Sequence, residues 1–394
     1  MNQFKWIGVL VVLVSILGVV TVDGPWAAEK KVVKIAYLGP LSGGSAEVGL
    51  AARNAFDLAV KQANASGRFN FTIETMALDD EANPATGVAA ALKAVSDPSV
   101  LAATGHFNSP VAMATIHTFH NAKVPFVVWG TVHPDITNKH NYPEVTRVAA
   151  TLETQCSVGA NFALTKMGYK NWAIIHDTND FGVGSKEIFS KYVKSLGGQL
   201  VSTDGATTGT TDFRPILTKI KGLKTVEGIY IGAVSMEGAL IRDQMSKLGM
   251  TDIVTMGNTG IQSETFNKVA GAAGEGALCT GFSNPHDSEK GRKLVEDYKK
   301  AGYRESFNEL SAPLAYDATN IILEALKKVG PEDKVALAKE IRNIRYDGVL
   351  GETVFDQFGQ TKYGGIKIYV SQDGAWKLWE SSEYASGKRK LPKK

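Results

Sequence analysis

Short, mostly apolar segments alternate with longer amphipathic segments along most of this chain, and this alternation limits the folds that it can adopt. The short segments have the composition of strands that are buried on both faces. The longer segments carry apolar residues three or four positions apart, which predicts helices that cover a sheet. We expect strands at 32–38, 71–78, 100–104, 125–129, 171–176, 199–203, 226–231 and 252–256, and helices at 48–63, 83–95, 152–167, 182–196, 213–221 and 236–248, with a further helix beginning at 109. This alternation predicts an α/β fold built on parallel sheets.

The length of the chain and its later part indicate more than one lobe. A chain of 394 residues is too long for one typical core, so two lobes are the default expectation. The strict alternation ends after the strand expected at 252–256. The later elements are expected as helices at 287–301, 312–329 and 333–341 and as strands at 276–282, 349–355 and 365–370.

The first 28 residues predict a signal peptide for export. Lys5 is the only charged residue among the first six, and residues 7–22 are almost wholly apolar. This run has the length of a signal-peptide core and is short for a membrane span of roughly 20 residues. Cleavage after Ala28 is indicated, with Trp26 at a position where a small residue is usual; an uncleaved anchor helix is the alternative. We expect a soluble protein in the periplasm.

Basic residues are concentrated at the C-terminus. The formal net charge is +3, and removing the five basic residues among the last seven would change it to about −2. We expect residues 386–394 to form a disordered basic tail. A nucleic-acid-binding protein would need a basic patch across the fold. The sequence shows no such patch, so we predict no nucleic-acid partner.

The chain has two cysteines, Cys156 and Cys279. Export would permit a disulfide between them. The sequence leaves open whether they meet, and two buried thiols are the simpler expectation.

We expect ligand-binding residues in the loops that follow the strands, because parallel sheets bind ligands beyond the carboxyl ends of their strands. These loops are rich in Gly, Ser, Thr and Asn, which let backbone N–H groups approach a ligand and add neutral hydrogen bonds. The loops are 40–43, 105–109, 129–132, 177–184, 232–235 and 257–260. Ser109 also precedes Pro110 at a predicted helix start, so we expect its hydroxyl to cap that helix.

Sequence patterns that would indicate an enzyme are missing. The chain has no phosphate-binding loop that ends in Gly-Lys-Ser/Thr, no Gly-x-Ser-x-Gly motif and no pair of Cys-x-x-Cys units. His117 and His120 stand three residues apart on a predicted helix, but no third metal ligand accompanies them. The loop that begins at Asp177 fails as a calcium site because Ile188 stands where a bidentate Glu is required. We therefore expect no catalytic residue, metal or cofactor.

Several short motifs occur along the chain in a fixed order. They are Gly39-Pro40-Leu41-Ser42-Gly43, Asp79-Asp80 with Pro84, Gly105-His106 with Ser109, Gly130, Pro134-Asp135-Ile136-Thr137, Ile174-Ile175-His176-Asp177, Phe181-Gly182-Val183-Gly184, Asp212-Phe213, Gly257 and Gly274-Glu275-Gly276. With this set the chain resembles the branched-chain amino-acid-binding proteins of bacterial ABC importers, from Lys34 to near its end. Each motif is weak alone, whereas their order is specific.

The resemblance implies the type I periplasmic-binding-protein fold. This fold has two doubly wound parallel-sheet lobes, joined by three hinge crossings, with the ligand in the cleft between them. It implies a first lobe of residues 29–150 plus 282–355 and a second lobe of residues 151–281 plus 356–385. The implied partners are a small-molecule solute, which closure would enclose, and ABC permease subunits in the inner membrane. We expect a monomer.

The resemblance also implies some ligand contacts. Ser109 matches a serine that binds a ligand carboxylate at a helix start. Gly130 matches a backbone position that contacts the ligand amino group, and Phe181 matches a second-lobe aromatic residue. Combined with the strand-end loops, this gives the predicted ligand-binding set Ser42, Phe107, Asn108, Ser109, Trp129, Gly130, Thr131, Phe181, Ser235, Asn258 and Thr259.

Thr259 stands where amino-acid-binding members of the group carry the acidic residue that pairs with the ligand ammonium. A buried ammonium without a carboxylate is costly, so an altered pocket is expected. We predict a small carboxylate- or amide-containing solute. Branched-chain amino acids are one candidate, and aromatic acids, amides and urea are others. A ligand-sensing protein for a membrane signalling receptor and an enzyme of unknown type are the alternative functions.

Overall fold

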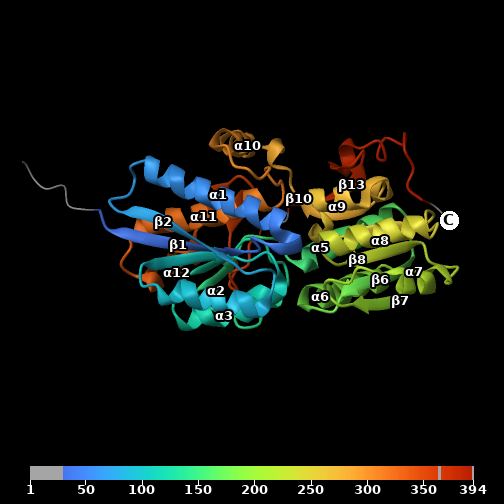
Figure 1. Cartoon of the computed structure of the whole chain (residues 1–394), viewed down its shortest axis with the longest axis horizontal. Helices are drawn as coiled ribbons and strands as arrows, with labels where there is room; N and C mark the ends of the chain where they lie inside the picture. Colours follow the sequence, from blue (N-terminus) through green and yellow to red (C-terminus); the bar gives the residue numbers. More distant parts are fainter. Residues whose placement is uncertain (1–29, 363–364, 393–394) are drawn as a thin grey trace, which may run out of the picture.

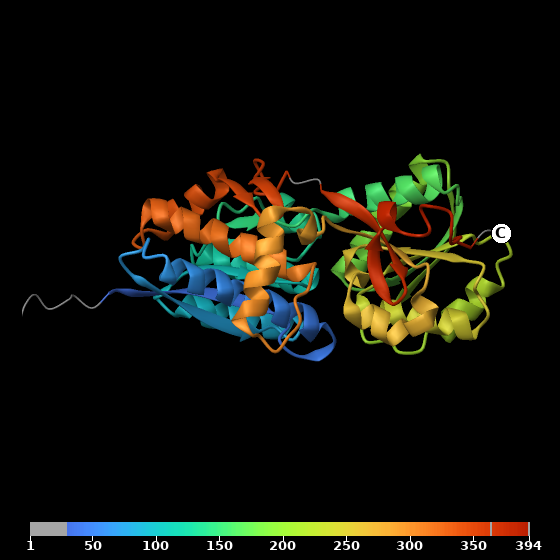
Figure 2. The ribbon, with the colours of Figure 1, turned by 90° about the horizontal axis from the view of Figure 1, so that it is seen from above.

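The chain folds into two α/β lobes that lie side by side along its long axis (Figure 1, Figure 2). This computed structural model describes residues 30–362 and 365–392. The predicted signal peptide, residues 1–28, lies outside the described residues. Within the described part, no helix has the length and apolar composition to cross a membrane. Each lobe is built on its own sheet, so the predicted two-lobed α/β fold is confirmed.

The first lobe contains a parallel sheet of five strands. In sheet order they are β2 (Thr72–Asp79), β1 (Val32–Gly39), β3 (Val100–Gly105), β4 (Phe126–Val128) and β5 (Val145–Arg147). In β1, Ile35 faces one buried layer and Ala36 faces the other, as expected for a sheet covered on both sides. The layers are formed by α1 (Ala46–Ala65) and α11 (Ser311–Val329) on one face and by α2 (Pro84–Ser96) and α3 (Ser109–Asn121) on the other.

The second lobe contains a seven-stranded sheet. In sheet order its strands are β7 (Gln199–Ala206), β6 (Asn171–Asp177), β8 (Gly228–Gly232), β9 (Val254–Gly257), β10 (Leu278–Phe282), β13 (Ile366–Gln372) and β14 (Ala375–Leu378). The first five are parallel, whereas β13 and β14 add an antiparallel edge. One face is covered by α5 (Leu152–Ala160) and α6 (Asp180–Ser195), and the other by α7 (Arg214–Lys221), α8 (Ser235–Lys247) and α9 (Glu264–Ala270).

The chain passes between the sheets three times: after β5, after β10 and before β13. The segment between the second and third crossings returns to the first lobe. Besides α11, it contributes α10 (Glu289–Ala301), α12 (Lys334–Asn343) and the hairpin of β11 (Arg345–Gly348) and β12 (Gly351–Val354).

A fully buried arginine connects two of the crossings. Arg147, the last residue of β5, donates through Nε to Gln360 Oε1 at 2.6 Å and through Nη2 to Thr137 Oγ1 at 3.3 Å. Its Nη1 donates to the carbonyl oxygen of His133. Gln360 Nε2 in turn donates to the carbonyl oxygen of Ala149 at 3.0 Å. Burial lowers the pKa of Arg147 to about 9, and neutral oxygens from several segments solvate its guanidinium.

Three strands were not predicted: β5, β11 and β14. Each has only three or four residues and mixes apolar with charged side chains. Such short segments lack the periodicity that identifies a strand. They form because a neighbouring strand, β4, β12 or β13, offers its backbone for pairing.

The two cysteines are buried free thiols, which confirms the simpler of the two expectations. Cys156 packs in the layer of α5 and α6, and Cys279 packs in the layer of α8 and α9. They therefore lie on opposite faces of the second sheet.

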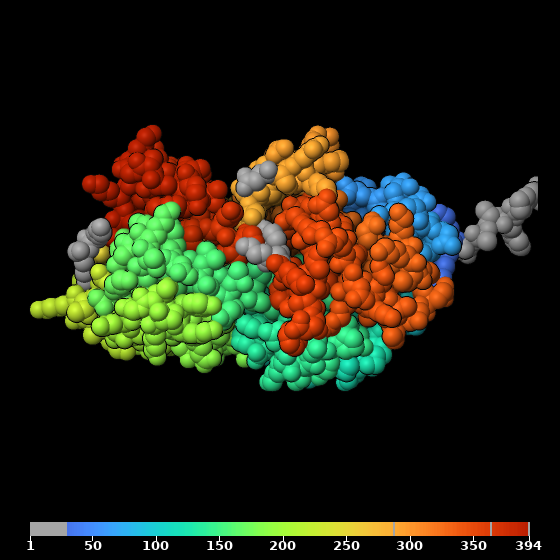
Figure 3. Space-filling model, turned by 180° about the vertical axis from the view of Figure 1, so that it is seen from behind, coloured from blue at the N-terminus to red at the C-terminus, as the bar shows by residue number. Residues whose placement is uncertain are grey.

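The C-terminal residues 386–392 pack on the second lobe, so the prediction of a disordered tail is wrong (Figure 3, deep red). The guanidinium of Arg389 lies 2.6–2.7 Å from carboxylates on three segments, which belong to Glu275, Asp373 and Glu383. Leu391 is buried in the second-lobe core. Composition revealed the positive charge of this segment but could not reveal the acidic residues that fix it.

We expect replacement of Arg389 by Ala to lower the thermal midpoint of unfolding by a few degrees, because three ion pairs hold the C-terminal segment on the lobe. Lys388→Ala is the matched control: it removes the same charge from a neighbouring exposed side chain. Thermal unfolding followed by circular dichroism would measure both. Equal midpoints for the two variants would show that these ion pairs contribute nothing to stability.

Candidate functional site

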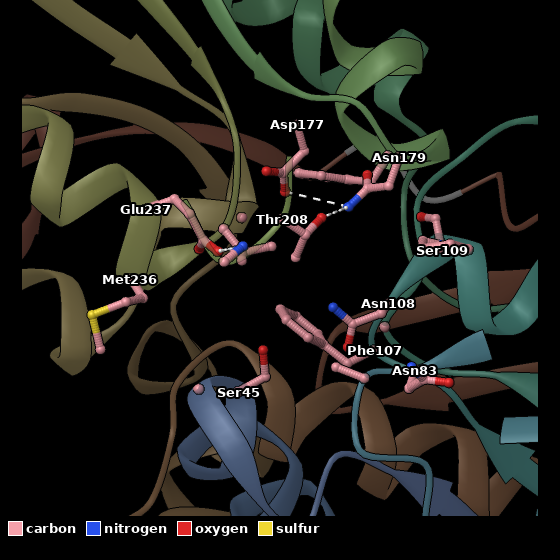
Figure 4. A pocket seen from close by; sticks show the side chains of 18 of the residues that line it. Ser45, Asn83, Phe107, Asn108, Ser109, Asp177, Asn179, Thr208, Met236 and Glu237 are labelled. Carbon is pink, nitrogen blue, oxygen red and sulfur yellow. Dashed lines mark hydrogen bonds between the residues drawn. The ribbon is translucent and has the colours of Figure 1, made fainter. Parts of the chain in front are cut away.

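A cavity of about 540 Å³ lies between the two lobes (Figure 4). Its volume falls within the range of about 300–1,000 Å³ that is typical of small-molecule sites. The lining residues come from the loops after β1, β2, β3 and β4 of the first lobe and after β6, β7, β8 and β9 of the second. Every wall of the cavity is thus formed at the carboxyl ends of parallel strands, where ligands bind in open α/β sheets.

The cavity brings together six residues of the predicted ligand-binding set. They are Phe107, Asn108, Ser109, Gly130, Phe181 and Thr259. The first four come from the first lobe and the last two from the second. The other five members, Ser42, Trp129, Thr131, Ser235 and Asn258, do not line it.

Trp129 and Thr131 are fully buried behind the first-lobe wall. The ring of Trp129 stacks between Tyr37 and Phe107, with ring centroids 6.2 Å and 6.0 Å apart. Trp129 therefore fixes the orientation of Phe107, which does line the cavity. Its apolar size made it a candidate ligand contact, whereas in the fold its large side chain fills the core.

Asn258 and Ser235 support the second-lobe wall from behind. Asn258 is fully buried, and its Nδ2 donates to Ser185 Oγ at 3.0 Å and to Tyr230 Oη at 3.2 Å. Its Oδ1 accepts from the N–H of Gly260, and Ser235 Oγ donates to the carbonyl oxygen of Gly260. Both side chains hold the loop after β9 in place. On the first lobe, the remaining residue of the set, Ser42, is exposed beside Asp79.

The first-lobe wall is centred on the start of α3. Ser109 is the first residue of this helix and Asn108 occupies the cap position, so the prediction that Ser109 caps the helix is wrong. Helical geometry begins one residue earlier than expected, and Pro110 still lies in the first turn, where its missing N–H costs no helical hydrogen bond. Ser109 Oγ instead accepts from the N–H groups of Val132 and His133, both at 3.4 Å. Asn108 Oδ1 is buried without a hydrogen-bond partner.

The second-lobe wall carries two carboxylates that the predicted set missed (Figure 4). Asp177 ends β6 and is 2% exposed, and its Oδ2 accepts from Asn179 Nδ2 at 3.3 Å. Glu237 stands in the first turn of α8 and is 6% exposed, and its Oε1 accepts from the N–H of Gly209 at 3.0 Å. Burial, with the charge of Glu237 as the next cause, raises the pKa of Asp177 to about 7.

The acidic residue is absent from the position that the resemblance implies, Thr259, but the cavity contains carboxylates from other positions. Thr259 contributes a hydroxyl that donates to Gln155 Oε1 at 3.0 Å, and the acidic groups come from β6 and α8 instead. Asp177 lies in a strand-end loop that the sequence singled out, but the residues selected there were neutral or aromatic. Glu237 lies beyond the loop, within the helix. Its one signal in the sequence is that it follows the end of β8 by five residues.

The arrangement offers hydroxyl, amide and carboxylate groups together with the rings of Phe107 and Phe181. Such a mixture suits reversible binding of a small solute that is polar at some atoms and apolar at others. Among residues 30–362 and 365–392, no group of three or more His, Cys, Asp or Glu side chains is placed to hold a metal ion.

Known proteins share this architecture. Residues 32–373 match the family described as periplasmic binding protein. The leucine-, isoleucine-, valine-, threonine-, and alanine-binding protein of Pseudomonas aeruginosa is 27% identical over 338 residues, which are 86% of this chain and 89% of that protein. The crystal structure of a leucine-binding protein from Thermotoga maritima has a TM-score of 0.80 at 26% identity, and covers 88% of this chain and 97% of its own.

A more distant structure shows the fold with another kind of ligand. The solute-binding protein of an ABC transporter from R. palustris, in complex with benzoate, has a TM-score of 0.79 at 18% identity, over 88% of this chain and 95% of its own. The family match spans both lobes and all the loops that form the cavity. The resemblance drawn from the ordered motifs is confirmed, and the chain belongs to the periplasmic binding protein family.

Proposed function

We propose that this chain is the solute-binding component of an ABC importer. It is exported by residues 1–28, works as a monomer in the periplasm, captures a small solute between its lobes and delivers it to permease subunits in the inner membrane. One observation carries the proposal: a single cavity takes its walls from both lobes, at the carboxyl ends of eight parallel strands. A solute bound there contacts both lobes at once, so its binding energy favours the closed form.

The proposed moving bodies are residues 29–150 plus 282–355 and residues 151–281 plus 356–385. Glu47 makes one of the contacts between them that lie outside the cavity lining. Glu47 on α1 of the first lobe accepts from the N–H and Oγ1 of Thr265 on α9 of the second, at 3.0 Å and 2.5 Å. Its other oxygen accepts from Asn308 Nδ2 at 3.2 Å, within the first lobe. Glu47 therefore supports closure without touching the solute.

Six residues are proposed as solute contacts: Phe107, Asn108, Ser109, Gly130, Phe181 and Thr259. Their support is their position in the lining and their chemistry. Phe107 and Phe181 provide apolar surface from opposite lobes. Gly130 lets the loops after β3 and β4 pack closely in this wall, because a Cβ at this position would lie only 3.1 Å from the carbonyl oxygen of His106. Asn108 Oδ1 is a buried acceptor that lacks a partner within the described residues.

The proposed function predicts that a small solute raises the thermal midpoint of the mature protein. The panel contains branched-chain and aromatic amino acids, benzoate-like acids, short amides and urea, because solved relatives of this fold hold isoleucine and benzoate. A solute at a hundredfold excess over its Kd stabilises the folded protein by about 2.7 kcal/mol. Differential scanning fluorimetry measures the midpoint. A panel without any shift, followed by calorimetry without any heat of binding, would contradict the proposal.

Closure also predicts an effect of Glu47→Gln on solute affinity. The variant removes the charge that spans the lobes, so we expect Kd for the best panel solute to rise several-fold while the spectrum of the folded protein is unchanged. Glu264→Gln is the control, since Glu264 is an exposed residue on α9 whose ion pair in the described part of the chain is with Lys268 of the same helix. Isothermal titration calorimetry measures both constants. If Kd for Glu47→Gln equals the control value, the contact between Glu47 and Thr265 does not stabilise the closed form.

A further inference from the structure

One of the two carboxylates of the second-lobe wall, that of Glu237, has incomplete hydrogen bonding. Glu237 Oε1 accepts from the N–H of Gly209, but Glu237 Oε2 is buried and has no hydrogen-bond partner. Figure 4 shows this side chain extending toward the cavity, on the same side as Asp177. A buried, unpaired carboxylate oxygen is costly. Its position in the lining indicates that the missing partner is supplied from the cavity.

The charged side chains among the described lining residues are all acidic. Glu81, on the loop after β2, adds a third carboxylate from the first lobe, and the described lining residues include no Lys, Arg or His. Asp177 and Glu237 therefore have no protein cation beside them in the lining. A solute that is only an anion would be repelled by this wall, whereas a positively charged group would be attracted to it.

One neutral side chain, that of Asn179, donates to Asp177. Asn179 Nδ2 donates to Asp177 Oδ2 and also to Thr208 Oγ1 at 2.9 Å, so one neutral amide serves both side chains. Burial, and after it the charge of the nearby Glu237, raises the pKa of Asp177 to about 7. A cation beside Asp177 would favour its ionised form.

We infer that the solute carries a protonated amine, which binds between Asp177 and Glu237 on the second lobe. This inference rests on the proposed function, because it names the solute class of the same cavity. The amine donates to Glu237 Oε2, the oxygen without a partner, and to the carboxylate of Asp177. The rest of the solute extends toward Phe107 and Ser109 of the first lobe. The acidic subsite is built from β6 and α8, at a different place from the loop of Thr259.

The test compares compounds that differ only in the amine. The pairs are leucine with isocaproate, phenylalanine with hydrocinnamate, and γ-aminobutyrate with butyrate; putrescine tests an amine without a carboxylate. Isothermal titration calorimetry of the mature wild-type protein gives Kd for each. In at least one pair we expect the amine-bearing compound to bind about tenfold or more tightly than its partner, as the loss of one member of a buried charge pair implies.

Two variants then locate the amine. Glu237→Gln and Asp177→Asn remove one charge each and keep the oxygen that accepts from the protein. We expect each variant to weaken the amine-bearing compound by about tenfold and to reduce the difference within its pair. Asp180→Asn is the control, because Asp180 is an exposed acid three residues from Asp177 that does not line the cavity. If a variant fails to fold, the comparison of each amine-bearing compound with its amine-free partner on the wild-type protein still tests the inference.

The outcomes separate this inference from the proposed function. Tight binding of the amine-free compounds, or unchanged affinity in both variants, would overturn the amine subsite while the solute-binding function stands. Binding of benzoate alone would have the same meaning. If no compound of this set or of the wider panel binds, the solute-binding function fails and the inference fails with it.

Discussion

Both lobes depend on the burial of a parallel sheet on two faces. Such a sheet needs helices on each side, and each helix returns the chain so that the next strand points in the same direction. All the parallel strands of a lobe then end at one edge. In this protein the two edges face each other, and the loops after eight strands form one cavity. The geometry of the site is thus a consequence of how apolar side chains are covered far from it.

The sequence predicted this architecture because burial leaves a clear pattern in it. Strands such as β3 and β8 are buried at every position, and the helices between them repeat apolar residues at helical spacing. The pattern failed where a segment depends on partners far away in the chain. The three-residue strand β5 is defined by its pairing with β4, and the ordered C-terminus is defined by carboxylates on other segments.

The site was predicted in part for a related reason. The strand-end loops were found correctly, because chain direction determines where strands end. Which side chain of a loop reaches the cavity depends on its neighbours: Trp129 turns into the core, and Glu237 projects from a helix beyond its loop. The resemblance implied where the family's acidic residue should stand, and Thr259 occupies that position. The tertiary structure supplies carboxylates from two other elements, which no spacing rule anticipates.

The buried Arg147 has a consequence for how the protein can bend. Its guanidinium is fully buried, and the hydrogen bonds it makes within residues 30–362 and 365–392 go to neutral oxygens of the hinge region and of the loop beside it. A rotation that separated these oxygens would leave a positive charge without solvation, which is among the costliest events in a protein interior. The hydrogen bonds of Arg147 and Gln360 thus tie the first crossing to the third, and the buried charge favours arrangements that keep them intact.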